Sequence, residues 1–386
     1  MSAAYDLRKH LSQMPWARLA GPLDGAGRAL TRADERLRRS PELAEGFCAR
    51  AHFFDTCAAM ALDGELVHLE DLVLHDAGTD KRAPTHELTR AARLLGLRRR
   101  MDRLEFSGLL SRTGIFSLIG QHQEEADQAR SEEHAGSAGG GGRLEPGGET
   151  PDRDQDETDL LAELDEVLQR SEHLALGMIP PRTNRAAHFA VQPEPGSDHT
   201  PKPETRLEDW LAVVTDVKAE KLPPVLAAAL LLDAWHILRP IESWPELGRF
   251  LTGAFLKGEM TPNHTPMLCA GLRKSPFRWR RQDALGTRLS ALLTGFEQAG
   301  AESSRDLDRL QLARDRLMRC CANSRRHSRL PEFISLFLTR PLVTIPMARQ
   351  DLGVTAAAVD HMIRQLGPAM PRELTGRNRY RAWGVL

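Results

Sequence analysis

The side chains of this sequence that are best suited to chemistry are arginines, and they gather toward its C-terminal end. Between Arg305 and Leu386 there are fifteen arginines, no lysine and seven acidic residues, an excess of eight positive charges. A guanidinium group donates several hydrogen bonds in one plane, which suits phosphate oxygens and base edges. This concentration of arginine predicts contact with a nucleic acid.

Two short helices separated by a glycine are expected to position part of this charge. The first, residues 345–352, follows Thr344, a candidate N-cap, and has a proline in its first turn. Gly353 suits the left-handed conformation that often ends a helix, and Thr355 is the candidate cap of the second helix, residues 356–366. Helix, tight turn and helix are the elements of a helix-turn-helix.

The second helix is expected to have one buried and one exposed face. Its apolar residues keep the spacing i, i+3, i+4 and i+7 and are Val359, Met362, Ile363 and Leu366. The opposite face begins with small residues, which let a helix approach base edges in the major groove, and continues with donors for bases and phosphates. The residues that we expect at DNA in this helix and its cap are Thr355, Ala356, Ala357, Asp360, His361 and Arg364.

A β-hairpin is expected after the second helix. Leu374, Tyr380 and Trp383 flank a Thr-Gly-Arg-Asn turn. Three arginines spaced by two share one face of this hairpin, and they are Arg377, Arg379 and Arg381. Such a hairpin is typical of a wing that contacts the phosphate backbone or the minor groove.

The same pattern leaves two alternatives open. Winged helices also serve as protein-docking modules, and two helices with a Leu-Gly turn occur in ordinary bundles. Arg349, four residues before Gly353, stands where such a motif usually needs a small side chain. Either this arginine turns outward or the two helices cross more loosely.

The composition favours helices over sheets. Hydrophobic residues make up 41% of the 386 residues but aromatic residues only 5%, so the core is built mostly from Leu and Ala. Five cysteines without a CxxC spacing favour a reducing cytoplasm and no zinc site. The N-terminal segment has no signal-peptide pattern, and the most apolar run, residues 222–238, is too short and too polar to span a membrane.

The fold class that we expect is mainly α, with a helical body in two blocks joined by a disordered acidic linker and a C-terminal winged helix-turn-helix. The linker is acidic and rich in glycine, and it lacks apolar periodicity. The two helical blocks should pack together as one unit. The expected segments are an N-terminal helical block (1–122), the linker (123–158), a central helical block (159–303), an Arg-rich connecting helix (304–330) and the winged helix-turn-helix (331–386).

The C-terminal segments LVTIPMARQDLGVTAAAVDHMIRQLG and PRELTGRNRYRAWGVL resemble a bacterial family that combines an α-helical region of unknown function with a C-terminal helix-turn-helix DNA-binding domain. More distantly, AAMALDGELVHLEDLVL and LPPVLAAALLLDAWHILRPIESWPELGRF resemble Fic-family proteins that carry a C-terminal winged helix. The Fic resemblance implies a nucleotidyl-transferase scaffold for the body.

The departures from the Fic motif remove its chemistry. Arg239 replaces the histidine that acts as general base, and an arginine cannot accept a proton at neutral pH. Residues 244–246 replace the Gly-Asn-Gly anion cradle and add a carboxylate. In the inhibitory segment, Ala59 and Asp63 replace serine and glutamate. We therefore expect no catalytic residue, and we expect His236 to be a buried structural residue.

One further cluster has residue types that metals bind, and it consists of His68, Glu70, Asp71, His75 and Asp76. Its two histidines are seven positions apart and HExxH is absent, so we expect no metal and no cofactor.

The sequence thus predicts a cytoplasmic, nucleoid-associated transcriptional regulator that binds double-stranded DNA as a homodimer, not an enzyme. The alternatives are a divergent Fic-type nucleotidyl-transferase and a protein-docking adaptor of a plasmid-maintenance or toxin–antitoxin type.

Overall fold

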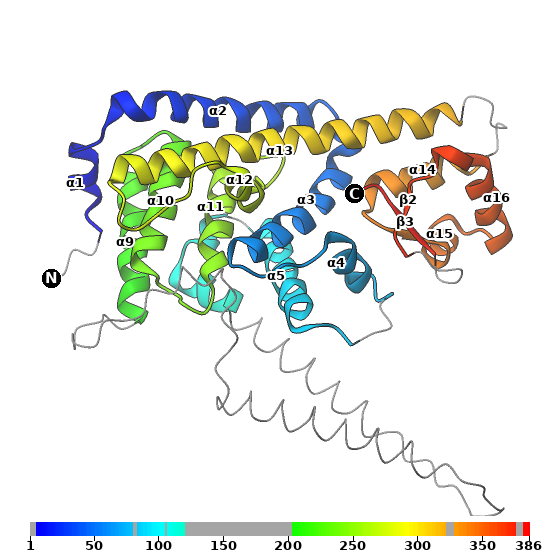
Figure 1. Cartoon of the computed structure of the whole chain (residues 1–386), viewed down its shortest axis with the longest axis horizontal. Helices are drawn as coiled ribbons and strands as arrows, with labels where there is room; N and C mark the ends of the chain where they lie inside the picture. Colours follow the sequence, from blue (N-terminus) through cyan, green and yellow to red (C-terminus); the bar gives the residue numbers. More distant parts are fainter. Residues whose placement is uncertain (1–4, 80–82, 105, 120–202, 322–327, 376–380) are drawn as a thin grey trace, which may run out of the picture. The chain divides into compact units, whose positions relative to one another are not determined.

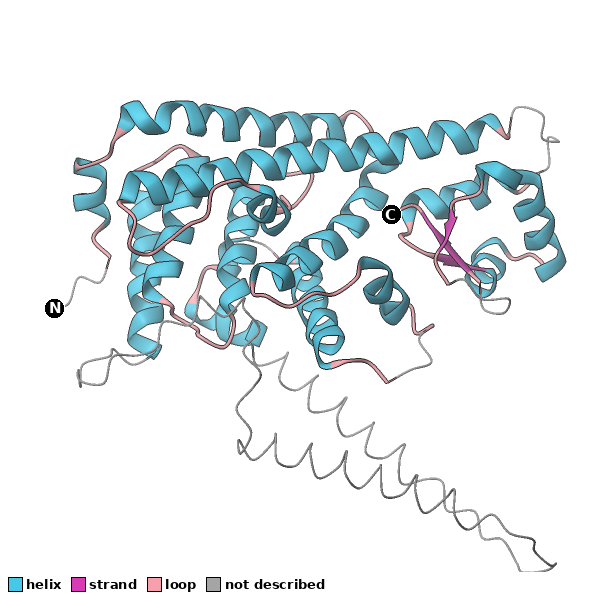
Figure 2. Cartoon of the chain, in the orientation of Figure 1, coloured by secondary structure: helices cyan, strands magenta, loops and turns pink. Residues whose placement is uncertain are grey.

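Apolar residues that recur every three or four positions fold most of the described chain into helices (Figures 1 and 2). The computed structural model describes residues 5–79, 83–104, 106–119, 203–321, 328–375 and 381–386. These elements confirm the mainly α fold. The expected linker and the first part of the expected central block lie outside the described residues.

The helical body contains two sets of helices. The N-terminal set is α1 (Leu7–Ser12), α2 (Trp16–Arg38), α3 (Pro41–Leu62), α4 (Leu69–Asp76), α5 (His86–Arg103) and α6 (Phe106–Leu109). The second set is α9 (Pro203–Ala219), α10 (Pro224–Leu238), α11 (Pro245–Glu259), α12 (Leu268–Lys274) and α13 (Leu285–Arg319).

Helix α10 lies in the centre of the body, as its apolar sequence predicts. It begins after Pro223 and ends at Arg239, which has a left-handed conformation with φ of 48°. Its one acidic residue, Asp233, is fully buried and accepts hydrogen bonds from Tyr5, Trp279 and Arg288 at 2.6–3.0 Å. The buried carboxylate is therefore both neutralised and hydrogen-bonded. No described helix is both long enough and apolar enough to cross a bilayer.

The two sets of helices pack together mainly through α2 and α13. A side chain at Gly300 of α13 would meet the backbone of Ala29 at about 2.5 Å, so a glycine is needed for this close approach. Helix α13 is continuous from Leu285 to Arg319 and has no break at the expected boundary between residues 303 and 304. Leu307, Leu310 and Leu317 continue the buried stripe of its first half, which explains why the helix does not end there.

The C-terminal domain combines three helices with a small sheet. Its elements are α14 (Leu330–Thr339), β1 (Val343–Thr344), α15 (Ile345–Leu352), α16 (Ala356–Leu366), a 3₁₀ helix (Gly367–Ala369), β2 (Arg372–Glu373) and β3 (Ala382–Gly384). Strand β3 lies between β1 and β2 and is antiparallel to both. A helix-turn-helix followed by this hairpin is a winged helix.

Arg50 of α3 joins the winged helix to the body. Its guanidinium is buried and donates five hydrogen bonds to backbone carbonyls at 2.6–3.0 Å. The acceptors outside its own helix are the carbonyl oxygens of Phe337, Leu338, Arg340 and Val385. Three of these lie at the end of α14, where carbonyls have no partner within the helix.

Gly46, one turn before Arg50, permits this contact. A Cβ atom at position 46 would lie 1.6 Å from the carbonyl oxygen of Leu338, so any other residue would force α3 and α14 apart. Burial lowers the pKa of the Arg50 guanidinium to about 10, which still leaves it charged at neutral pH. Arg50 therefore keeps its full set of donors.

We predict that Arg50→Met lowers the free energy of unfolding by about 3 kcal/mol or more, because buried carbonyls lose their only charged donor. Urea unfolding of the full chain measures this loss. The matched control is Arg28→Met on α2, where the arginine is exposed beside Asp24 and the expected change is below about 0.5 kcal/mol. Equal losses in the two variants would show that Arg50 has no special role.

Candidate nucleic-acid interface

The helix-turn-helix is organised by two threonine caps and one glycine, as the sequence predicts. The Thr344 hydroxyl accepts a hydrogen bond from the Met347 amide at 3.3 Å and begins α15. Gly353 ends this helix in the left-handed conformation, with φ of 62°. The Thr355 hydroxyl then accepts from the Ala358 amide at 3.2 Å and begins α16.

The buried face of α16 is the predicted apolar stripe, of which Val359, Met362 and Leu366 are buried and Ile363 is partly buried. At the crossing of α15 with α16 the small residue is Ala348, which is fully buried. Arg349, its neighbour, is exposed. Of the two alternatives, the outward orientation of this arginine is therefore the one that the structure adopts.

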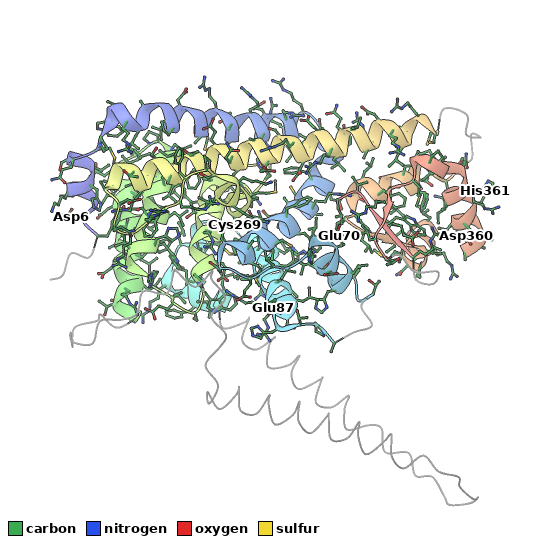
Figure 3. The ribbon with its side chains drawn as sticks, viewed as in Figure 1. Asp6, Glu70, Glu87, Cys269, Asp360 and His361 are labelled. Atoms are coloured by element: carbon green, nitrogen blue, oxygen red, sulfur yellow. The ribbon has the colours of Figure 1, made fainter. Side chains whose placement is uncertain are left out.

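The opposite face of α16 is open. All six predicted residues of this helix and its cap are exposed, and they are Thr355, Ala356, Ala357, Asp360, His361 and Arg364. Figure 3 shows Asp360 and His361 at the outer edge of the helix. The small residues occupy its first turn and the larger polar residues follow. We name these six residues the reading face.

The predicted hairpin is present, but its tip is not described. Strands β2 and β3 pair with Glu373 opposite Trp383, and the Leu374 amide donates to the Ala382 carbonyl at 2.8 Å. Arg377 and Arg379 fall in residues 376–380, outside the described residues. They remain a prediction.

Arg381, the third predicted wing arginine, is held by its own hairpin. It donates two hydrogen bonds to the Glu373 carboxylate at 2.6 and 2.9 Å, and its guanidinium lies 4.8 Å from the centre of the Trp383 ring. The hydrogen bond from Arg381 lowers the pKa of Glu373, so the carboxylate stays charged and balances the arginine. This pairing was not predicted from the sequence.

The other arginines after residue 304 that the structure describes divide into two groups. Those within 4.0 Å of a carboxylate, as Arg381 is, are Arg305, Arg309, Arg314, Arg329, Arg340 and Arg372. Within the described part of the chain, four exposed arginines have no carboxylate partner, and they are Arg316, Arg319, Arg349 and Arg364. Arg349 and Arg364 belong to α15 and α16 of the helix-turn-helix, and Arg316 and Arg319 belong to the last turn of α13.

The segments that resemble the Fic motif lie together in the body. Asp63, after α3, contacts Arg249 of α11 at 2.7 Å, while Arg90 contacts both Glu65 and Glu246. Burial raises the pKa of Glu246. The position expected for an anion cradle is thus occupied by carboxylates and arginines that pair with one another.

His236, the candidate displaced base, is half-buried near this cluster. Its ring lies 4.7 Å from the Trp279 ring, and burial lowers its pKa to about 4. This environment fits a structural residue.

Two carboxylates of the cluster at residues 68–76, for which we expect no metal, form ion pairs with arginines. Asp76 contacts Arg99 at 2.6 and 2.9 Å, and Glu70 contacts Arg372 at 3.3 Å. Across the residues that the structure describes, no group of three or more His, Cys, Asp or Glu side chains is arranged to hold a metal ion.

Comparison with known proteins identifies the C-terminal domain. Residues 330–386 match a family described as "HTH DNA binding domain", so the chain carries a helix-turn-helix DNA-binding domain. Residues 197–322 match a family described as "Protein of unknown function (DUF1612)". This second match adds no support to the Fic resemblance.

A relative covers the whole chain. The "Uncharacterized protein y4cF" of Sinorhizobium fredii is 37% identical over 390 residues, which is 99% of this chain and 100% of the relative. The chain belongs to the same family as y4cF.

We predict that Gly353→Val lowers the free energy of unfolding by about 1–2 kcal/mol, because a branched side chain is strained at this positive φ. A Cβ atom there would meet nothing within 4 Å, so the effect comes from backbone conformation alone. Gly353→Asn is the matched control, since asparagine tolerates the left-handed region better. Urea unfolding should give the parent the highest free energy of unfolding, the Asn variant the next and the Val variant the lowest. A Val variant as stable as the parent would contradict the left-handed conformation of Gly353.

Proposed function

We propose that this protein is a sequence-specific DNA-binding regulator of transcription, and that α16 enters the major groove of its target. The observation that carries this proposal is the exposed reading face of α16. This helix is capped at its start by Thr355, and its opposite, apolar face is buried. A major groove about 12 Å wide admits an α-helix. The match of residues 330–386 to a DNA-binding domain supports the same conclusion.

Each part of the reading face has a role that follows from its chemistry. Ala356 and Ala357 bring the backbone of α16 close to the bases and offer apolar contact to thymine methyl groups. His361 and Arg364 donate hydrogen bonds to base edges or phosphates, and Asp360 accepts from the amino group of cytosine. Thr355, Arg377 and Arg379 fix the register through phosphates.

Specific recognition calls for more than one reading helix, because one short helix contacts few base pairs. We propose that the protein binds DNA as a homodimer, with one half-site for each copy. The partner is duplex DNA in the bacterial nucleoid, which places the protein in the cytoplasm.

The two alternatives have less support. A Fic-type transferase needs a base and an anion cradle, but Arg239 stands at the base position and Glu246 is buried at the cradle, paired with Arg90. A protein-docking adaptor would use the same winged helix without DNA. Selection from random duplexes at two salt concentrations separates these functions, since only the DNA regulator yields enriched sequences and salt-sensitive binding.

We predict that Ala357→Glu weakens binding to the enriched duplex by at least about tenfold, because it places a bulky negative charge on the reading face. An acidic residue in the first helical turn does not destabilise α16. The control is Ala20→Glu, on an exposed position of α2. Fluorescence anisotropy measures both, and an unchanged affinity in Ala357→Glu would overturn the assignment of the reading face.

For the wing, we predict that Arg377→Gln with Arg379→Gln lowers the slope of log affinity against log salt by about 1.8, which is about 0.9 for each lost phosphate contact. Arg381→Gln should change the slope little, because Glu373 already balances this arginine. A large loss of slope in Arg381→Gln alone would show that DNA displaces the Glu373 contact.

A further inference from the structure

The last turn of α13 belongs to the body, but it ends beside the end of α16. The Arg316 guanidinium donates a hydrogen bond to the carbonyl oxygen of Pro368, two residues after α16. Leu317 is buried in the same apolar cluster as Leu366. This hydrogen bond, together with the shared apolar cluster, places the last turn of α13 close to the segment that follows the DNA-binding helix.

The positive charge of this turn is not balanced by a carboxylate. Arg316 and Arg319 are exposed, and in the described chain their hydrogen bonds go only to backbone carbonyls, of Pro368 and of Asp315. Asp315 is the acidic residue nearest to both in sequence, but its carboxylate accepts from Arg314 at 3.0 and 3.1 Å. Two full positive charges therefore face solvent at this end of α13.

About two and three turns earlier on the same helix the situation is reversed. Arg305 lies 2.8 Å from Glu302, and Arg309 lies 2.6 Å from Asp306. These arginines are as exposed as those of the last turn, but each has an acidic partner within its own helix. The same helix thus provides a charged turn and a neutralised turn.

We propose that Arg316 and Arg319 form a second backbone contact, through which the body holds DNA phosphates beside the base pairs that α16 reads. This inference rests on the proposed function. Guanidinium groups without a carboxylate partner bind phosphates without first breaking an ion pair. The contact carries no sequence information, so it adds the same affinity to every duplex and places the winged helix on the DNA together with its body.

The test compares Arg316→Gln with Arg319→Gln against Arg305→Gln with Arg309→Gln in the full chain. The probe is a labelled duplex that carries the enriched sequence and extends about one helical turn beyond it on each side. The first variant should lower the slope of log affinity against log salt by about 1.8. It should also weaken binding to the enriched duplex and to unrelated duplexes by the same factor. The second variant should keep the slope of the parent, since its charges are already balanced.

Two further measurements show whether a loss of binding comes from the lost charge or from lost contacts within the protein. The variant with Arg316→Lys and Arg319→Lys keeps both charges and should keep the slope, although it loses the planar donor group at Pro368. Trimming the duplex to the enriched base pairs should abolish the difference between the parent and the glutamine variant. Equal slopes for the parent and the Arg316/Arg319 glutamine variant, or equal losses in both glutamine pairs, would overturn this proposal alone. A parent that binds no duplex at all would overturn the proposed function with it.

Discussion

The buried guanidinium of Arg50 determines how this molecule is put together. It satisfies carbonyls at the end of α14 and the carbonyl of Val385 after β3, so one side chain binds the first helix and the last strand of the winged helix. An uncompensated charge at this depth would be very costly, and so would the free carbonyls. The DNA-binding domain is consequently anchored to the body by this side chain.

The body uses the same device elsewhere. Asp233 is surrounded by three donors, and Asp55 accepts from Arg98 at 3.0 Å although each of these two residues is only 2% exposed. A buried charge without its partner is very costly, so a buried ion pair favours the one alignment of two helices that brings its partners together. We infer that these pairs fix the relative positions of helices that carry mostly Leu and Ala at their contacts.

The local parts of the interface could be predicted from the sequence because their causes are local. Thr344, Gly353 and Thr355 act on the backbone within a few residues, and the stripe from Val359 to Leu366 repeats with the helical period. Arg50 could not be found this way, since an arginine in an apolar helix gives no indication of carbonyls nearly three hundred residues away. The continuity of α13 was missed because its exposed face changes composition at residue 304 while its buried face does not.

For the arginines too, the sequence predicts one property and the fold determines another. Their number in the sequence predicts a nucleic-acid partner, but a carboxylate that lies within reach competes with phosphate for the same donors. Arg381 and Arg372 belong to the hairpin and are paired, one with Glu373 and the other with Glu70 of α4. Within the described residues, Arg349 of α15 and Arg364 of α16 have no carboxylate within 4.0 Å. Among the described arginines, the charge available to DNA is therefore set by the fold, which gives some of them an acidic partner and leaves others without one.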